Sequence, residues 1–522
     1  MTESASEAKS DGPIVPAAPP VNDRNTRKPT DLLIVRLFLL ILGVLLMAYA
    51  CLGRGFAHVG MGPVYVGEFV LALGLVATAV AAVRSRLQIS RSWLVVVLLV
   101  FMVLGLIRTV PYLRTDGMNS LRDATLWGYA VFALMIFALL DRDWVLRLFR
   151  LYGYAAVAFL FWGPVAYYLY THYTIETTPG SFVFVSSLIP NPPGSDVPLL
   201  FFKSQDMAVQ TAGAIAFLIV GTPLVRRLRD FLWRFAAAVP AFWMVYITGT
   251  VTRGGLVAVA ACVGVLGVLS ARTRNWIPVI AGAIFVAAMV AANVTVPSLG
   301  TGSAPSSTPV AVQSGETPVA VQSGETPVAI ATPAPTPAPT PAPLPSWAAS
   351  RQATTTQWWD NIISIFTNSG NSQLEGTKQF RLDWYKAIIK YTFNGRYFWD
   401  GKGFGVNLAT DDGFRGPDGS LREVPNSHLA VMARMGVPGF LLWILLQLGF
   451  ALVLLRALLA HRRGGDKGLA AVAAWVLAFW TAMMVNTTFD PYLEGPQGGI
   501  WFWVLFGLGL VVIRLAPRRK AE

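Results

Sequence analysis

An arginine beside two glycines is the first candidate for chemistry in this sequence. Arg253 lies in Thr-Val-Thr-Arg-Gly-Gly, residues 250–255, just before an apolar stretch. A guanidinium group presents a planar fork of donors that fits a phosphate or pyrophosphate, and neighbouring glycines let a ligand approach the backbone. An arginine that merely extends toward lipid head groups would give the same pattern. Arg253 is therefore a candidate for binding phosphate.

A second candidate lies in Gln-Phe-Arg-Leu-Asp-Trp-Tyr-Lys, residues 379–386. Helical spacing places Arg381 and Tyr385 on one face and makes an i, i+3 pair of Asp383 and Lys386. A solvated surface helix would explain this pattern equally well. Arg381 becomes a candidate anion-binding residue if the fold brings it close to the other candidates.

The third candidate is a histidine that follows Pro-Asn-Ser at the start of another apolar stretch. Asn426 or Ser427 can cap that helix, which leaves His428 in its first turn. The positive end of the helix dipole disfavours protonation, so the neutral imidazole could accept a proton as a general base. A structural hydrogen-bonding role is the alternative. If His428 is the base, replacing it with Ala should slow the reaction about 10²–10⁴-fold.

Other basic residues are expected beside these three, where they would attract an anionic substrate. We expect Arg122, Lys203 and Arg434 to bind substrate together with Arg253 and Arg381. Acidic residues that could neutralise some of this charge are Asp206, Asp490 and Glu494.

The cysteines and histidines form no metal-binding pattern. Both cysteines, Cys51 and Cys262, lie in apolar runs, and the four histidines show no H-x-x-x-H spacing. We therefore expect neither a metal nor a cofactor, although carboxylates could still hold Mg²⁺ or Ca²⁺.

The composition indicates where these residues must be positioned. The chain has 522 residues, 54% of them hydrophobic and only 13% charged. A soluble domain carries about twice that charged fraction, so we expect an integral membrane protein. The net charge of +13 does not indicate nucleic-acid binding, because the basic residues cluster in the connections between apolar runs.

Twelve apolar stretches have the length of about 20 residues that is needed to cross the hydrocarbon layer. The sequence therefore predicts an all-α polytopic membrane protein with one continuous helical bundle and a large, partly helical external loop between helices nine and ten. The predicted spans are 32–52, 64–83, 93–112, 123–140, 151–170, 206–224, 232–249, 254–271, 276–296, 430–456, 468–488 and 498–515.

Basic residues mark alternate connections, and by the positive-inside rule these connections are cytoplasmic. This orientation places both termini in the cytoplasm and the three candidate residues on the external face. The clusters are Arg84, Arg86 and Arg91; Arg142, Arg147 and Arg150; Arg226, Arg227 and Arg229; Arg272 and Arg274; Arg462, Arg463 and Lys467; and Arg518, Arg519 and Lys520.

The remaining segments have distinct compositions. The amino-terminal one is rich in Ser, Pro and charge, and lacks the apolar core of a secretory signal. The repeat TPVAVQSGE and a Pro-Ala-Thr tract predict an extended spacer in the external loop. The predicted organisation is a disordered cytoplasmic tail at 1–30, helices one to nine at 31–296, the spacer at 297–346, an external catalytic-loop segment at 347–429, helices ten to twelve at 430–516 and a basic cytoplasmic tail at 517–522.

Taken in order, several short motifs resemble the O-antigen ligase and polymerase superfamily. The resemblance covers about residues 120–510 and includes the enlarged external loop between spans nine and ten. The family's usual Ser-Arg-Gly is Thr-Arg-Gly here, and the repeat-bearing spacer has no counterpart. The motifs are Thr252-Arg253-Gly254, Arg381-x-x-Trp384, Gly401-Lys402-Gly403-Phe404-Gly405, Asn426-Ser427-His428 and Arg434-Met435-Gly436-Val437-Pro438-Gly439.

Members of this family are glycosyltransferases that take a glycan from a polyprenyl pyrophosphate carrier on the outer face of the bacterial cytoplasmic membrane. The resemblance implies that Arg253 and Arg381 hold the pyrophosphate and that His428 activates the acceptor hydroxyl, which belongs to a glycan or a lipid-linked glycan. A pyrophosphate is already an activated leaving group, so a base and nearby cations suffice for transfer. We therefore expect a metal-independent transfer with inversion at the anomeric carbon.

The sequence leaves other functions open. A polymerase that joins carrier-linked repeat units would share the donor chemistry of a ligase. A transporter or flippase of lipid-linked glycans would also have many spans and an arginine-lined cavity, but paired halves and helices broken at the bilayer midplane are not evident. A sensor is disfavoured because no cytoplasmic output domain is present.

Overall fold

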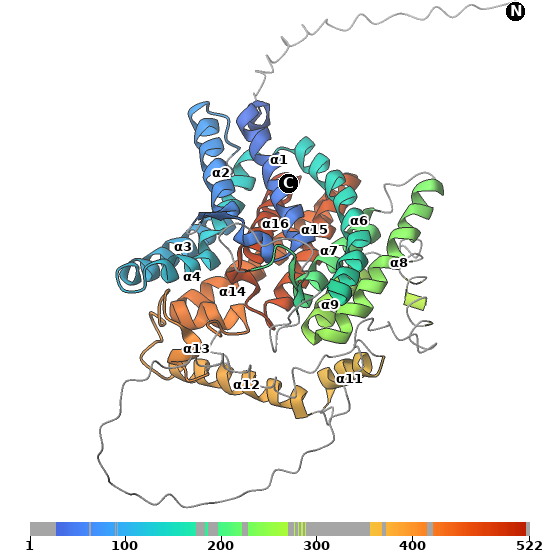
Figure 1. Cartoon of the computed structure of the whole chain (residues 1–522). Coiled ribbons are helices and arrows are strands. Elements are labelled where there is room, and N and C mark those ends of the chain that lie inside the picture. Colours follow the sequence, from blue (N-terminus) through green and yellow to red (C-terminus); the bar gives the residue numbers. More distant parts are fainter. Residues whose placement is uncertain are drawn as a thin grey trace, which may run out of the picture.

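The structure, a computed structural model, is all-helical apart from two short antiparallel strand pairs (Figure 1). It describes residues 28–61, 64–88, 90, 92–173, 183–185, 197–221, 228–269, 276, 280, 283–284, 288, 355–367, 372–414 and 421–517. The predicted amino-terminal tail up to residue 27, most of the predicted span 276–296, the spacer at 297–346 and residues 518–522 lie outside this part.

The helices follow the apolar runs of the sequence. They are α1 Leu33–Leu52, α2 Val66–Val83, α3 Trp93–Thr109, α4 Met118–Gly128, α5 Ala130–Leu139, α6 Arg142–Tyr173, α7 Ser204–Gly221, α8 Leu228–Val251, α9 Arg253–Leu269, α11 Thr355–Phe366, α12 Ser372–Phe393, α13 Leu408–Asp411, α14 Ser427–Arg463, α15 Lys467–Asn486 and α16 Pro496–Arg514. Short 3₁₀ helices are η1 Pro29–Asp31, η2 Gly55–His58, η3 Val110–Leu113 and η7 Tyr492–Glu494.

The four strands are very short. Strand β1, Gly60–Met61, pairs with β2, Val64–Tyr65, and β3, Val183–Val185, pairs with β4, Phe201–Lys203. Both pairs are antiparallel.

Within the described residues, eight helices are long and apolar enough to cross a membrane, and nine if the bent pair α4 and α5 counts as one span. The protein is therefore a multi-pass membrane protein. The shorter apolar helix α9 and helix α7 coincide with two further predicted spans. Helices α15 and α16 are the most enclosed spans, and α15 contacts α7, α9, α14 and α16.

Two predicted spans have a different form in the structure. The stretch 123–140 is not one straight helix: α4 ends at Gly128, and α5 continues at an angle of 42°. A glycine adjoining a bend is a common cause of such kinks, because it restrains the backbone least. The stretch 430–456 belongs to a longer helix, α14, which starts at Ser427 and is interrupted at Gly436.

The interruption in α14 requires a glycine. Gly436 has φ of +68°, and a β-carbon there would lie 2.5 Å from the carbonyl oxygen of Phe398. Pro438 follows and cannot donate a helical hydrogen bond. The amide of Val437 instead donates to the carbonyl of Phe398, 2.8 Å away. The break therefore binds the chain that follows α12 to the start of α14.

The two ends of the bundle hold different parts of the chain. At the terminal end, which we define by Lys28, Asp143 and Asp466, Lys28 contacts Asp143 at 2.6 Å and Arg142 contacts Asp466 at 2.8 Å. At the opposite end, the α12 end, helices α11 and α12 lie together below the bundle in Figure 1. The three candidate residues Arg253, Arg381 and His428 all lie at the α12 end, on α9, α12 and α14.

Candidate functional site

The segment 484–490 is the centre of the α12 end. It comprises the last turn of α15 and a further turn, in which the amides of Thr487 and Asp490 donate to the carbonyls of Met483 and Asn486 at 2.9 and 3.1 Å. Side chains from four different parts of the chain converge on it. Only Asp490 of this segment is a candidate from the sequence, as a neutralising charge.

The helices that carry the two candidate arginines both contact Phe489 of this segment. Arg381 is half-buried and donates from Nη1 to the carbonyl oxygen of Phe489 at 3.1 Å. Arg253 begins α9, and the next residue, Gly254, packs against the same phenylalanine, because a β-carbon there would lie 2.8 Å from its Cβ. Helices α9 and α12, which carry arginines 128 positions apart in the chain, therefore both contact Phe489.

Helix α11 packs against the end of α8 and the start of α9. Asn361 is buried and donates from Nδ2 to the carbonyls of Gly249 and Thr250, at 3.0 and 2.8 Å, at the end of α8. This satisfies carbonyls that the helix end leaves unpaired. Ser364, one turn further, lies 3.4 Å from Nη1 of Arg253. No sequence motif pointed to Asn361 or Ser364.

Helix α12 is fixed by two aromatic side chains. The hydroxyl of Tyr385 donates to the carbonyl of Pro425 at 2.9 Å, and the indole of Trp384 donates to Asp412 at 2.7 Å. These bonds orient α12 so that Arg381 points toward Phe489. Tyr385, predicted on the same face as Arg381, thus serves to hold the helix in place.

His428 is held by hydrogen bonds on both ring nitrogens. The indole of Trp443 can only donate, and it donates to Nδ1 at 3.0 Å. In the neutral ring the proton must then be on Nε2, which lies 3.0 Å from the carbonyl oxygen of Met484 and 2.9 Å from Oγ1 of Thr487. The lone pair that a general base needs is therefore engaged by Trp443.

The start of α14 confirms the predicted cap. The side chain of Asn426 accepts from the amide of Leu429 at 3.1 Å. The amide of Ser427 donates to the carbonyl of Thr487 at 2.8 Å, which joins this helix start to the segment 484–490. His428 thus lies where expected, in the first turn, but it faces the end of α15.

Asp490 is held by Lys203 and by Arg54, which is not among the candidates from the sequence. Arg54 donates to Asp206 at 2.7 Å and to Asp490 at 2.7 Å, while Lys203 contacts Asp490 at 2.9 Å. Burial favours protonation of Asp490, but Lys203 and Arg54 together lower its pKa below the ordinary value. Lys203, expected to bind substrate, is thus engaged with a carboxylate. Arg54 could have been found, because it stands between two glycines, as Arg253 stands before two.

Arg434 does not reach an open surface, in contrast to the expectation from the sequence. Its side chain is fully buried, with Nη2 at 2.7 and 2.8 Å from the two carboxylate oxygens of Glu423 and Nη1 at 3.0 Å from Asp123. Asp123 also accepts from Arg422 at 3.0 Å. This cluster joins α4, the chain before α14 and α14 itself, so Arg434 stabilises the α12 end from inside.

Arg122 lies on α4 and is exposed. Burial and the positive charge of Arg122 lower the pKa of His58, so this arginine lies near the β1–β2 hairpin. Among the described residues, no hydrogen bond or ion pair joins its side chain to the segment 484–490.

Glu494 is a buried carboxyl group in which both oxygens lack a hydrogen-bond partner among the described residues. Burial, followed by the negative charge of Glu423, raises its pKa well above the ordinary value. The folded protein then holds this proton at pH values where the unfolded chain, with a pKa of about 4.3, has lost it. Stability contributed by the group is therefore lost as pH rises above about 4.3 toward the folded pKa.

We expect Glu494→Gln to unfold at a higher temperature than the wild type at pH 7 and at nearly the same temperature at pH 4. Thermal unfolding in detergent across this pH range measures the effect. A temperature difference that is equal at all pH values would assign it to packing and would contradict the protonation argument.

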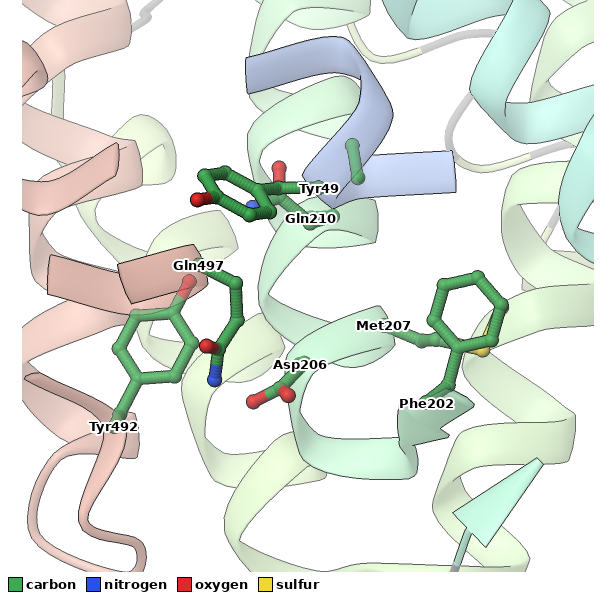
Figure 2. A pocket seen from close by; sticks show the side chains of 8 residues that line it. Tyr49, Phe202, Asp206, Met207, Gln210, Tyr492 and Gln497 are labelled. Atoms are coloured by element: carbon green, nitrogen blue, oxygen red, sulfur yellow. The ribbon is translucent and has the colours of Figure 1, made fainter. Parts of the chain in front are cut away.

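A small pocket lies beside the Arg54 network. Eight residues line it, among them Tyr49 of α1, Asp206 and Gln210 of α7, and Tyr492 and Gln497 (Figure 2). Figure 2 shows the carboxylate of Asp206 between Tyr492 and Met207. The hydroxyl of Tyr49 is buried without a hydrogen-bond partner among the described residues. The pocket is polar on the side toward α16 and belongs to the same end of the bundle as the arginines.

No group of three His, Cys, Asp or Glu side chains in the described part of the chain is arranged to hold a metal ion. The acidic residues Asp123, Asp206, Glu423 and Asp490 are instead engaged by arginines or lysines. No protein-family model matches the chain, and no curated protein matches it.

Proposed function

We propose that this protein is a membrane glycosyltransferase of the O-antigen ligase type, which moves a glycan from a polyprenyl pyrophosphate carrier to an acceptor hydroxyl. The observation that supports this proposal is that Arg381 and the start of α9, where Arg253 lies, both contact Phe489, in a bundle end bounded by α11 and α12. Two guanidinium groups at the same end of the bundle suit a diphosphate, since each can donate two parallel hydrogen bonds.

The proposed chemistry follows from the positive charges of Arg253 and Arg381 at the α12 end. Transfer breaks the bond between the anomeric carbon and the pyrophosphate oxygen, and the acceptor oxygen takes its place with inversion. The acceptor hydroxyl loses its proton as the new bond forms, and the departing pyrophosphate takes that proton up. Negative charge grows on the departing pyrophosphate, and preorganised cations stabilise it most when water is excluded. Arg253 and Arg381 can supply this charge without a metal ion. Full loss of transfer in excess chelator, restored by Mg²⁺ or Mn²⁺, would contradict this form of the mechanism.

The proposal also states how many times the chain crosses the membrane and which end faces outward. The chain crosses the cytoplasmic membrane of a bacterium twelve times, with both termini in the cytoplasm and the α12 end on the external face. Basic residues at the terminal end, such as Arg84, Arg142 and Arg462, support this orientation by the positive-inside rule. The lipid-linked donor then reaches the arginines from the outer leaflet.

His428 has a different role in this proposal from the one that the sequence suggests. Its two nitrogens join Trp443 of α14 to Met484 and Thr487 of α15, and so it positions the segment that carries Phe489. A glutamine can reproduce one acceptor and one donor, but it cannot act as a base.

We therefore expect His428→Gln to keep most of the transfer activity per folded molecule. His428→Ala leaves the Trp443 indole unpaired and should cost about 1–3 kcal/mol of stability. Activity and thermal unfolding of both variants test this. A loss of about 10²–10⁴-fold in both variants, with stability intact in His428→Gln, would restore the general-base role.

Gene deletion followed by electrophoresis of the envelope polysaccharide tests the proposed function. Undecorated acceptor with full-length chains left on the carrier is the result expected for a ligase. Acceptor decorated with single repeats would indicate a polymerase. Carrier-linked glycan that accumulates only on the cytoplasmic face would indicate a transporter, and an unchanged envelope would contradict all three.

A further inference from the structure

Helix α12 has an apolar stripe that no described part of the chain covers. Leu382, Ile389 and Phe393 are 42%, 45% and 47% exposed. They are seven and four residues apart, close to whole numbers of helical turns, so they form one line along the helix. The stripe is distinct from the face that holds α12 in place, where Trp384 and Ile388 are fully buried.

Charged residues flank the stripe on the side away from the bundle. Lys386 and Lys390 are exposed, and Lys386 contacts Asp383 at 3.4 Å. Arg396 is also exposed and follows the end of the helix. Around α12 the order is therefore a buried face, a lateral apolar stripe and an outer face with basic residues.

An exposed tryptophan, six residues after α12, lies beside the end of α3. Trp399 is 70% exposed, and its carbonyl oxygen accepts from Nη2 of Arg108 at 3.0 Å. Arg108 lies in the last turn of α3, a membrane-spanning helix in which Leu106 and Ile107 are 50% and 56% exposed. Exposed apolar residues of a spanning helix face lipid, so Trp399 lies beside the point where α3 leaves the hydrocarbon layer. Tryptophan is enriched at this depth of membranes.

We propose that α12 lies in the membrane interface, with Leu382, Ile389, Phe393 and Trp399 inserted among the acyl chains of the adjacent leaflet. Lys386, Lys390 and Arg396 then contact the phosphates of anionic lipids. A helix with an apolar side, a basic side and a terminal tryptophan is the kind that binds in this plane. The hydrogen bond that joins Trp399 to Arg108, at the end of a spanning helix with lipid-exposed residues, is the argument for lipid as the occupant. The inference does not depend on the proposed catalysis.

Spin labels on the full-length protein test this inference. In a Cys51→Ser, Cys262→Ala background, single cysteines are introduced as Ile389→Cys and Phe393→Cys on the stripe. The matched controls are Lys386→Cys and Lys390→Cys, on the same helix. The labelled proteins are reconstituted in vesicles of phosphatidylcholine and phosphatidylglycerol. Power-saturation measurements then compare collisions with oxygen, which concentrates in the acyl region, and with a water-soluble nickel complex.

We expect oxygen collisions to exceed nickel collisions at 389 and 393, and the opposite order at 386 and 390. Equal access of nickel to both pairs of positions would overturn the proposal, because the stripe would then face water.

A second measurement uses the unmodified protein and phospholipids with a photoactivatable group at the end of the acyl chain. Tryptic peptides 391–396 and 397–402 contain Phe393 and Trp399, and peptide 92–108 contains most of α3. We expect adducts on all three peptides. Adducts on 92–108 without any on 391–396 and 397–402 would overturn the proposal.

Discussion

Replacing Arg434 with Ala should remove about 3–5 kcal/mol of the free energy of unfolding, the largest loss of stability that we expect from any single change in this protein. The guanidinium group is fully buried between Glu423 and Asp123. Without it, Asp123 and Glu423 keep only the partly exposed Arg422, at 3.0 and 3.5 Å, as a cationic partner among the described residues. The energetic cost comes from two buried carboxylates that share one cation in place of two, as well as from the lost hydrogen bonds.

Thermal and denaturant unfolding of the purified protein in detergent measure this loss. Arg434→Met combined with Glu423→Gln is the matched control, because it removes the charge of both partners and should recover part of the stability. Arg422→Ala is a second control, since Arg422 shares Asp123 but remains partly exposed to water. An Arg434→Ala variant as stable as the wild type would show that Glu423 and Asp123 take up protons at no cost.

Removing either candidate phosphate-binding arginine should reduce transfer about 10²–10³-fold, the size of effect seen when one stabilising donor is lost from a preorganised site. Arg381→Gln deletes the cation that binds the carbonyl of Phe489, and Arg253→Gln deletes the cation beside Ser364 at the start of α9. Arg253→Lys and Arg381→Lys should remain clearly defective, because an ammonium group does not reproduce a bidentate fork.

The readout is glycan transfer by a deletion strain that carries each variant, normalised to the amount of protein in the membrane. Lys386→Gln is the matched control on α12, because this lysine is exposed on the outer face and should not affect transfer. Full activity of both glutamine variants, with normal protein levels, would contradict the proposed donor site. Loss in the Arg253 variant alone would leave Arg381 as a structural contact to Phe489.

Much of the fold could be predicted because the lipid environment restricts it. Helices α1, α2 and α3 lie within a few residues of the predicted spans 32–52, 64–83 and 93–112. The bend between α4 and α5 was not predicted, since hydropathy does not report the direction of a helix. The start of α14 at Ser427 follows from the Asn426 cap, but the break at Gly436 depends on the approach of Phe398.

The sequence indicates which types of residue form the site, but not which side chains they pair with. Arginine next to glycine identified Arg253, and the same signal is present at Arg54. The ion pair between Arg54 and Asp490 joins residues 436 positions apart, and no local pattern encodes it. Trp443 lies four turns of α14 beyond His428, and it decides which ring nitrogen carries the proton. Such long-range contacts determine whether a plausible side chain is available for chemistry.

The main-chain bonds around the break in α14 also restrict how the α12 end can move. The amides of Lys402 and Gly403 donate to the carbonyls of Ala433 and Arg434 at 2.7 and 3.1 Å, in addition to the bond between Val437 and Phe398. The chain that follows α12 is thereby held to a membrane span by three main-chain hydrogen bonds. If the helix swings aside to admit a bulky lipid-linked chain, it must pivot there, so Ser372 travels furthest and Arg381 is carried with it.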